Sequence, residues 1–227
     1  MREHPTLFSA PMVRAILAGT KTQTRRLVKG PRGKSWNAVY WQDSFDGGGQ
    51  PGLACADICA PLSDPPECFG EWRIKCPFGV PGDRLWVRET WADLIAAGFD
   101  GPEKLAYFEQ YLSRDGTHED PESKRCRLDY GVKWRPSIHM PRWASRITLE
   151  VQNIRVERLQ EITEEDAQAE GVTPFPHDLE GDCWTDGKHR TAFEYLWDQI
   201  NRDRATWSSN PWVWVVEFKR AESQVTP

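Results

Sequence analysis

The sequence predicts an α+β fold, in which long antiparallel strands form a small, partly closed barrel with short helices at the turns. Two segments carry this prediction. Residues 145–162 alternate apolar and polar side chains from Ile147 to Val151, and 211–220 (PWVWVVEFKR) is typical of a buried strand. The glycine-rich phosphate-binding patterns of Rossmann and P-loop folds do not occur in the sequence. Because 227 residues can bury a sizeable core, we expect a single domain over 1–227.

The N-terminal elements follow from capping and spacing. Residues 6–9 (TLFS) have the character of a short strand. Ser9 is a suitable N-cap and Gly19 a suitable C-terminal stop for a helix whose apolar residues have helical spacing. We expect 21–27 to be extended, with alternate threonines on one face.

The middle of the chain contains two predicted insertions. Residues 28–75 are rich in Gly, Pro and Cys and have little periodicity, which predicts a long irregular insertion. Residues 79–91 predict a turn that leads into a strand. A second insertion is expected over 93–130, with a helix around 103–112 and a polar loop at 113–125.

Two helices are predicted between the long strands. Thr163 and Asp166 form a T-x-x-D capping box at the start of a short helix over 163–171, and Gly171 ends it. Residues 189–201 have the apolar spacing of an amphipathic helix.

Six cysteines raise the question of a metal site. Four of them lie in or beside the first insertion: Cys55, Cys59, Cys68 and Cys76. Their spacings contain no C-x-x-C pair, so the pattern favours free thiols, and a zinc ion remains the open alternative. No cofactor is expected.

Targeting signals are missing from the sequence. It contains no apolar run of about 18 residues, and its first residues lack the features of a signal peptide. We therefore expect no membrane partner and a cytoplasmic protein.

Charge is distributed unevenly along a chain whose net charge is −5. Residues 1–34 carry eight Lys and Arg against one acid, and residues 133–146 carry four with no acid. Overall acidity argues against a long nucleic-acid track, because such affinity comes from many phosphate contacts. Two local basic segments, together with 12 tryptophans that offer stacking faces, suit a modified nucleoside or a short single-stranded RNA.

The segment LAGTKTQTRR contains a candidate base. Lys21 can act as a base if burial or neighbouring cations make its charge costly, and Arg25 and Arg26 are near in sequence. A hydroxyl, from Thr22 or Thr24, would then be the nucleophile. The alternative is a basic turn in solvent.

Glu170 is unusual for its position. It lies at the predicted C-terminal end of a helix, where the dipole disfavours a carboxylate, and it follows Asp166 by four residues. A residue that violates local rules without visible compensation indicates either function or an exposed side chain of no consequence.

The segment KWRPSIHMPRWASR offers groups for ligand binding. Its tryptophans provide stacking faces, its arginines provide forked donors, and its histidine can be a base or a hydrogen-bond partner, although a lone histidine is more often structural. The candidates are Trp134, Arg135, His139, Arg142 and Trp143. For both indoles, core packing is the alternative.

Taken in order, these motifs resemble those of the ASCH family, within the PUA-like superfamily. The resemblance comprises Gly19, Lys21 and Arg26 in a G-x-K-x-x-x-x-R stretch, CPFGVPGDRLWVRETW, KWRPSIHMPRWASRITLEV and ITEEDAQAEGV. It covers residues 5–27, 76–92 and 132–218, and it indicates a larger member of phage or prophage type. Arg25 departs from the pattern, since it replaces an apolar residue.

The resemblance implies a PUA-like barrel with a ligand cleft. One activity in this family is the metal-independent removal of the acyl group of N4-acetylcytidine. The positions that match its catalytic residues are Lys21, Thr24 and Glu170. In this hypothesis Lys21 is the base, Thr24 the nucleophile, and Glu170 orients Lys21 or moves a proton.

The resemblance also leaves other functions open. Arg26 would neutralise the oxyanion in the catalytic hypothesis, whereas the alternative is a non-catalytic module that binds RNA or a modified nucleotide, or a nuclease. We expect Lys21, Thr24 and Glu170 to converge in one cleft and residues 133–143 to form a wall of it. Sequence leaves open whether burial or Glu170 dominates the pKa of Lys21.

Overall fold

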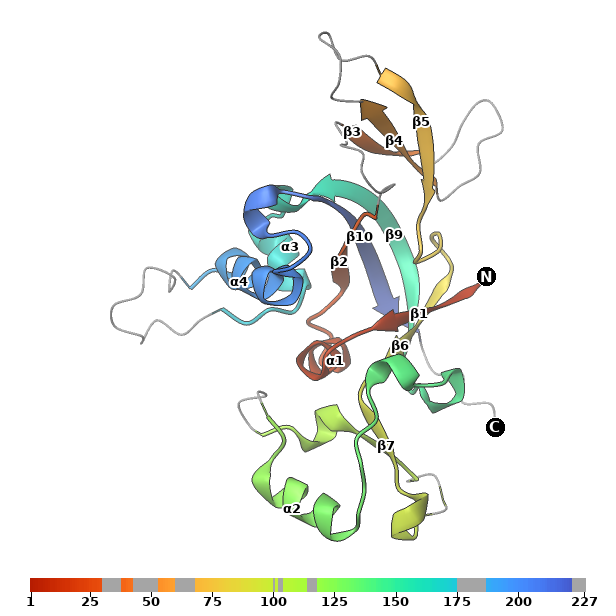
Figure 1. Ribbon diagram of the computed structural model, residues 1–227, viewed down its shortest axis with the longest axis vertical. Helices are drawn as coiled ribbons and strands as arrows, with labels where there is room; N and C mark the ends of the chain where they lie inside the picture. Colours follow the sequence, from red (N-terminus) through yellow and green to blue (C-terminus); the bar gives the residue numbers. More distant parts are fainter. Residues whose placement is uncertain are drawn as a thin grey trace.

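The computed structural model describes residues 1–29, 38–42, 53–59, 68–99, 101, 104–113, 118–174 and 187–221. It is a mixed α+β structure with a central five-stranded sheet, a separate three-stranded sheet and a small two-stranded sheet. Along the long axis of the molecule, the central sheet lies between the three-stranded sheet at one end and the two-stranded sheet at the other (Figure 1).

The central sheet has the order β1-β6-β9-β10-β2. Its strands are β1 (Glu3–Leu7), β2 (Gln23–Leu27), β6 (Arg84–Arg88), β9 (Thr148–Arg158) and β10 (Trp212–Arg220). The β1–β6 pair is parallel and the other pairs are antiparallel, with an irregularity at Glu217/Phe218 where β10 pairs with β9. The two strands at the edges, β1 and β2, are consecutive in sequence and are connected through helix α1 (Ala10–Leu17).

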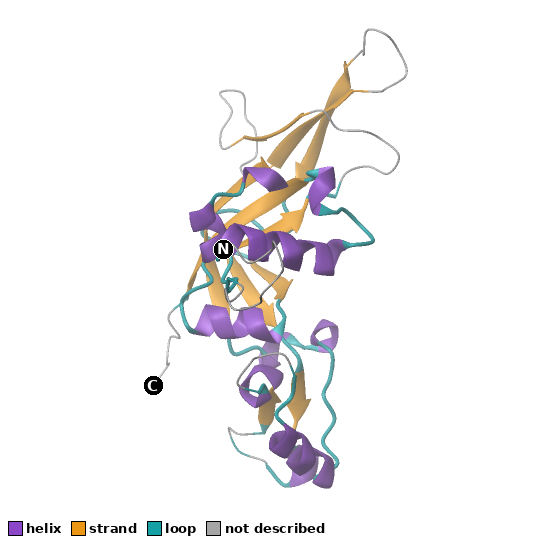
Figure 2. Cartoon of the chain, turned by 90° about the vertical axis from the view of Figure 1, so that its left-hand side faces the viewer, coloured by secondary structure: helices purple, strands orange, loops and turns teal. Residues whose placement is uncertain are grey.

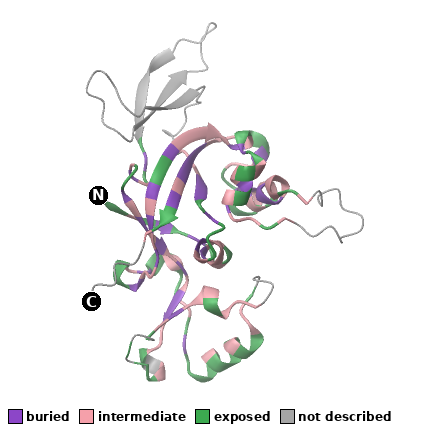
Figure 3. Ribbon diagram, turned by 180° about the vertical axis from the view of Figure 1, so that it is seen from behind, coloured by how far each residue is buried: buried purple, intermediate pink, exposed green. Residues whose placement is uncertain are grey.

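Helices cover both faces of this sheet. Alternation along β10 sends Trp214 and Val216 to one face, where they pack with Val13 of α1, and Val213 and Val215 to the other. The second face is covered by α3 (Glu164–Ala169) and α4 (His189–Asn201). Figure 2 shows this arrangement from the side, and Figure 3 shows buried positions concentrated in the central strands.

A second lobe holds β7 (Trp91–Asp93), β8 (Leu105–Tyr107) and α2 (Pro121–Asp129). Its small core includes Trp91, Met140 and Ala144, and no residue of α2 is buried. Six short 3-10 helices complete the described elements of the chain: η1 (Ile95–Ala97), η2 (Phe108–Tyr111), η3 (Ser137–His139), η4 (Arg142–Ala144), η5 (Leu159–Glu161) and η6 (Trp207–Ser209).

Several predicted elements are confirmed. The two long strands are β9 and β10, and the helix over 189–201 is α4. Both halves of the capping box form at α3, where Thr163 and Asp166 each bind the other's backbone N–H. Among the described residues, no helix has the length and apolar character needed to cross a membrane.

Three predictions for the insertions differ from the structure. The region 28–75 contains an antiparallel sheet of β3 (Ala38–Gln42), β4 (Leu53–Cys59) and β5 (Cys68–Lys75), whose pairing spans segments too far apart for a local periodicity to reveal. The expected helix at 103–112 is β8 followed by η2, because this segment pairs with β7. In addition, α2 begins within the expected loop at 113–125.

Candidate functional site

A cavity of about 500 Å³ lies beside β2. This strand is at the edge of the central sheet, so only one side of it pairs with another strand of that sheet. Ligand sites commonly have this size and an apolar wall with a few polar groups. Its polar lining includes residues of β2 and Glu170 at the C-terminus of α3, and its apolar lining comes mainly from α4. The lining includes Thr24, Arg25, Arg26, Glu170, Met12, Phe78, Phe193, Leu196, Trp197 and Trp214.

Lys21 and Glu170 form a buried ion pair next to this cavity. The Lys21 Nζ lies 2.7 Å from Glu170 Oε2 and donates a second bond, also 2.7 Å, to the Glu170 backbone oxygen. The two side chains are 0% and 4% exposed. Glu170 caps the C-terminus of α3. The ammonium group therefore compensates both the helix-end carboxylate and a free carbonyl, which is why the carboxylate is tolerated there.

The backbone brings these two residues together although 149 positions separate them. Lys21 and Glu170 form an antiparallel bridge, and the Thr22 N–H donates to the Ala169 oxygen at 2.8 Å. Gly171 has a φ of +73°, and a Cβ at this position would lie 2.8 Å from the Lys21 Cβ. A glycine at 171 thus permits both the left-handed turn and the close approach of Lys21.

Burial dominates the electrostatics of Lys21. Removal from water lowers the pKa of the ammonium, Glu170 raises it, and Arg26 and Arg25 lower it further. The net result is a pKa below the usual lysine value. The question that the sequence left open is therefore answered in the direction that a base requires.

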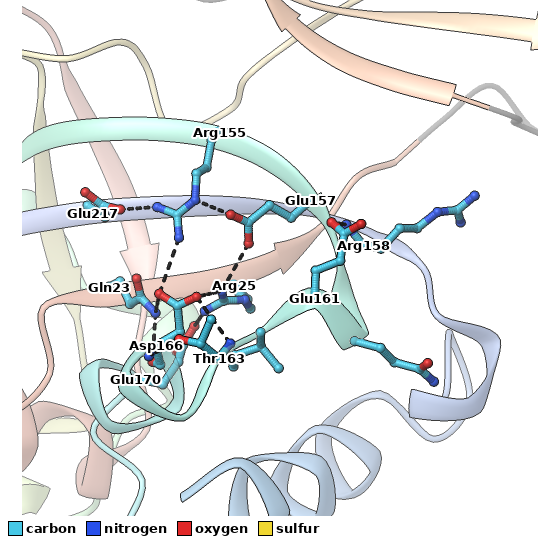
Figure 4. A network of polar contacts seen from close by, with 12 residues as sticks. Gln23, Arg25, Arg155, Glu157, Arg158, Glu161, Thr163, Asp166, Glu170 and Glu217 are labelled. Carbon is cyan, nitrogen blue, oxygen red and sulfur yellow. Dashed lines mark hydrogen bonds and ion pairs between the residues drawn. The ribbon is translucent and has the colours of Figure 1, made fainter.

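Arg25 belongs to a charged network on the α3 side of the sheet (Figure 4). Its Nη2 lies 3.1 Å from Glu157 Oε2 and 2.9 Å from Asp166 Oδ2. Arg155 also binds Asp166 and Glu157. Burial acts to raise the pKa of Asp166, but the cations and hydrogen-bond donors around it outweigh burial, and the pKa is lowered. These ion pairs connect β2, β9 and α3 to one another.

Several buried polar atoms at the cavity lack a hydrogen-bond partner. They are Glu170 Oε1, Arg25 Nε and Nη1, and Arg26 Nε. Glu170 Oε1 has only the longer 3.5 Å ion-pair contact to Arg25 Nη1. Because unpaired buried groups are costly, atoms of this kind indicate a place for a polar ligand or water.

Arg26 and Thr24 lie on the face of β2 opposite to Arg25, as the register with Trp214 and Val216 shows. The Arg26 Nη2 donates to the Leu7 oxygen at 2.6 Å, and burial lowers the pKa of its guanidinium. Within the described part of the chain, the Thr24 hydroxyl makes no hydrogen bond. Its oxygen is thus available to a molecule in the cavity.

Lys21 contacts Glu170 as expected, and Thr24 lines the same cavity as Glu170, whereas Lys21 itself does not line that cavity. Sequence reasoning missed the apolar wall. Phe193, Leu196 and Trp197 of α4 line the cavity, yet their helical spacing predicts only core packing. Their apolar spacing is visible in the sequence, but an ordinary amphipathic helix that packs on a core has the same spacing.

The segment 133–143 does not form a wall of this cavity, contrary to expectation. None of its residues lines it, and its side chains pack within the second lobe or face solvent. Trp134 packs edge-on against Phe108 and Tyr111, and its Nε1 donates to Glu119.

The other candidates in this segment have partners of their own or lie at the surface. The Arg135 guanidinium stacks over Trp91, and Arg142 binds Glu3 with two nitrogens. Trp143 is 66% exposed, and His139 is also exposed. The segment lies away from the cavity because the Arg135 backbone pairs with that of Trp91, and this pairing places the segment in the second lobe.

No cluster of three or more metal-binding side chains occurs among the described residues. The side chains of Cys55, Cys59 and Cys68 lie outside the described set, so the zinc alternative stays untested. Cys76 is a buried free thiol, and burial raises its pKa to about 12.

Comparison with known proteins gives no relative: no family model matches the chain, and no curated protein or solved structure is significantly similar to it. The resemblance to the ASCH family rests on the motifs alone.

Proposed function

We propose that this protein is an amidohydrolase of ASCH type that removes an acyl group from the N4 amine of a cytidine-like nucleoside. The observation that carries the proposal is the buried Lys21–Glu170 pair, with its lowered lysine pKa, beside a cavity that Thr24 also lines. A base, a nucleophile and a cationic group, Arg26, are thereby near one cavity.

The proposed PUA-like, partly closed barrel is supported by the two edge strands of the central sheet. Arg26 on β2 donates to the Leu7 oxygen at the end of β1 and lies over the Phe8 ring at 5.4 Å. Edge strands that approach each other indicate a strongly curled sheet, which α1 crosses at its opening (Figure 1).

The reaction would proceed in two stages. Neutral Lys21 takes the proton of the Thr24 hydroxyl as the oxygen forms a bond to the acyl carbon, and Arg26 stabilises the resulting oxyanion. The C–N4 bond then breaks, the proton passes from Lys21 to the leaving amine, and an ester remains on Thr24. Water cleaves this ester, which yields the carboxylic acid and restores the threonine.

The rest of the cavity suits a nucleoside. Phe193, Trp197 and Trp214 provide aromatic surface for a base, and the volume of about 500 Å³ is within the range of small-molecule sites. Arg25 Nε and Nη1, which make no hydrogen bond, can donate to ligand oxygens, and Glu170 Oε1 can accept from a ligand N–H.

A second function is favoured by one observation. Lys21 donates to both the carboxylate and the backbone oxygen of Glu170, an arrangement that also suits a purely structural ion pair. In that case the cavity binds a modified nucleotide or the base of an RNA without catalysis.

The test is incubation of the purified protein with N4-acetylcytidine, with cytidine release followed by chromatography. Thr24→Val removes the nucleophilic oxygen while keeping the shape, so cytidine release should be lost while N4-acetylcytidine still binds. Thr22→Val is the matched control, because Thr22 is exposed and does not line this cavity.

Release of cytidine by the wild-type chain and by Thr22→Val, but not by Thr24→Val, supports the enzyme. Binding without release in all three proteins favours the binding module. Equal release by Thr24→Val would exclude Thr24 as the nucleophile.

A further inference from the structure

A second cavity, of about 460 Å³, continues from the first at the end of β2. Leu27, Lys29 and Arg204 line both cavities, so the two are neighbours with a shared wall. The remaining lining consists of Val28, Arg158, Ala205, Pro211 and Trp212. None of these side chains is acidic.

The three cations of this second cavity are available to a ligand. Lys29 and Arg204 are exposed and have no ion-pair partner among the residues that the structure describes. Arg158 lies 4.2 Å over the Trp212 ring and donates to the Asn210 oxygen at 3.1 Å, which fixes its guanidinium in place. The nearby carboxylate of Glu161 accepts from the Arg158 backbone N–H, and among the described residues no ion pair joins it to the guanidinium (Figure 4).

An uncharged hydrogen-bond donor accompanies these three cations. The Trp212 Nε1 is buried and has no hydrogen-bond partner. Three cations and a free N–H around an opening without acids form a site for an anion of high charge density. Phosphate is the anion that accompanies nucleosides.

We propose that the second cavity binds a phosphate that is attached to the nucleoside held in the first. This inference rests on the proposed function and names its substrate class, namely a phosphorylated nucleoside, which is either a free nucleotide or one unit of an RNA strand. The first cavity takes the base beside Thr24, and Lys29 and Arg204 stand between the base and the phosphate.

The length of β2 agrees with this arrangement. A strand rises roughly 3.3 Å per residue, so the backbone of Leu27, the last residue of β2, lies roughly 10 Å beyond that of Thr24. Just beyond the end of β2, Lys29 lines both cavities, as does Arg204. A ribose and one phosphate thereby fit between the reacting amine and the cations.

The test measures binding by calorimetry, with the wild-type chain and with the double variant Lys29→Gln/Arg204→Gln. The probes are cytidine, cytidine 5′-monophosphate, cytidine 3′-monophosphate and a short oligocytidine. Within the part of the chain that the structure describes, neither side chain makes a hydrogen bond or an ion pair, so the variant should keep its thermal stability. The matched control is Arg202→Gln, an exposed cation two positions away that lines neither cavity.

In the wild-type chain and in Arg202→Gln, a phosphate should tighten binding about tenfold relative to cytidine, since one or two charge-assisted hydrogen bonds form. The double variant should lose this preference, so that it binds cytidine and its monophosphates equally. A preference for the oligonucleotide over both monophosphates identifies an RNA strand as the source of the phosphate, and equal affinities identify a free nucleotide.

Equal binding of cytidine and its monophosphates by the wild-type chain would overturn the inference, as would a preference that survives in the double variant. Absence of binding by every probe would overturn it too. These measurements need no catalysis, so they test the phosphate site separately from N4 deacylation. Either proposal can therefore fail while the other is supported.

Discussion

Two ion pairs with buried carboxylates lie in different parts of this molecule, and they differ in what surrounds them. Lys21–Glu170 lies between β2 and α3, and Glu89–Arg146 lies between the central sheet and the second lobe. Both carboxylates are almost fully buried. Burial of the carboxylates alone would place the two pairs in one class.

Their hydrogen bonds separate them. Arg146 contacts both Glu89 oxygens at 3.0 Å, reaches Glu109 as well, and stacks over the Tyr107 ring at 4.1 Å. Every Glu89 carboxylate oxygen is therefore satisfied. Glu170, in contrast, keeps one oxygen without a hydrogen bond, and that oxygen is beside a cavity.

The pKa values shift in ways that fit this difference. Burial raises the pKa of Glu89 even though Arg146 opposes it, and burial lowers the pKa of Lys21 even though Glu170 opposes it. A perturbed pKa by itself therefore does not identify a site. The comparison teaches that a cavity and unpaired atoms are needed in addition.

The strongest test of this contrast changes the base. Lys21→Arg should lower the rate of N4-acetylcytidine cleavage roughly 10²–10⁴-fold, because a guanidinium keeps the charge but cannot release its proton. Initial rates together with a thermal melt measure this effect on folded protein. A variant that keeps most of its activity would show that Lys21 contributes only charge.

The second pair should affect stability instead. Glu89→Ala should lower the free energy of unfolding by about 3 kcal/mol, since it leaves Arg146 with Glu109 alone in a mostly buried position. Urea denaturation measures the loss, and the rate per folded molecule should be unchanged. A large fall in rate without loss of stability would assign function to this pair and erase the contrast.

The pH dependence sharpens the role of Lys21. If neutral Lys21 is the base, kcat/KM should rise about tenfold per pH unit up to an apparent pKa below 10.5, the ordinary lysine value. Glu170→Gln should lower that apparent pKa further, because the carboxylate raises it. The measurement is a pH–rate profile of both proteins. A shift upward in Glu170→Gln would contradict the assignment.

The smallest expected effect concerns the second lobe. Trp134→Ala should cost about 2 kcal/mol of stability, less than a fully buried tryptophan, and leave cytidine affinity unchanged. Trp143→Ala is the control, since its exposed indole should change stability by less than about 0.5 kcal/mol. A loss of affinity in either variant would return the segment 133–143 to the ligand site.

Local patterns were enough for the elements that depend on neighbours in sequence. The alternation in β9 and β10 and the capping box at Thr163 depend on residues two to four positions apart, so they were predictable. Lys21 and Glu170 were candidates for the same reason, because a cationic stretch and a carboxylate at a helix end are visible locally.

The positions of the remaining candidates depended on contacts between distant segments. Arg135 and Trp134 have the composition of a ligand wall, yet pairing with the Trp91 backbone directs them into the second lobe. Likewise, β4 pairs with β5, and the residue pattern within either segment does not predict that pairing.

By itself the sequence determined the long strands, the helix caps and the residue types available for chemistry. Only the tertiary structure decided that burial lowers the pKa of Lys21 against the opposing charge of Glu170, and that α4 closes the cavity with Phe193 and Trp197. The physical reason is that desolvation depends on everything packed around a group, and those atoms come from segments some 150 residues apart in the chain.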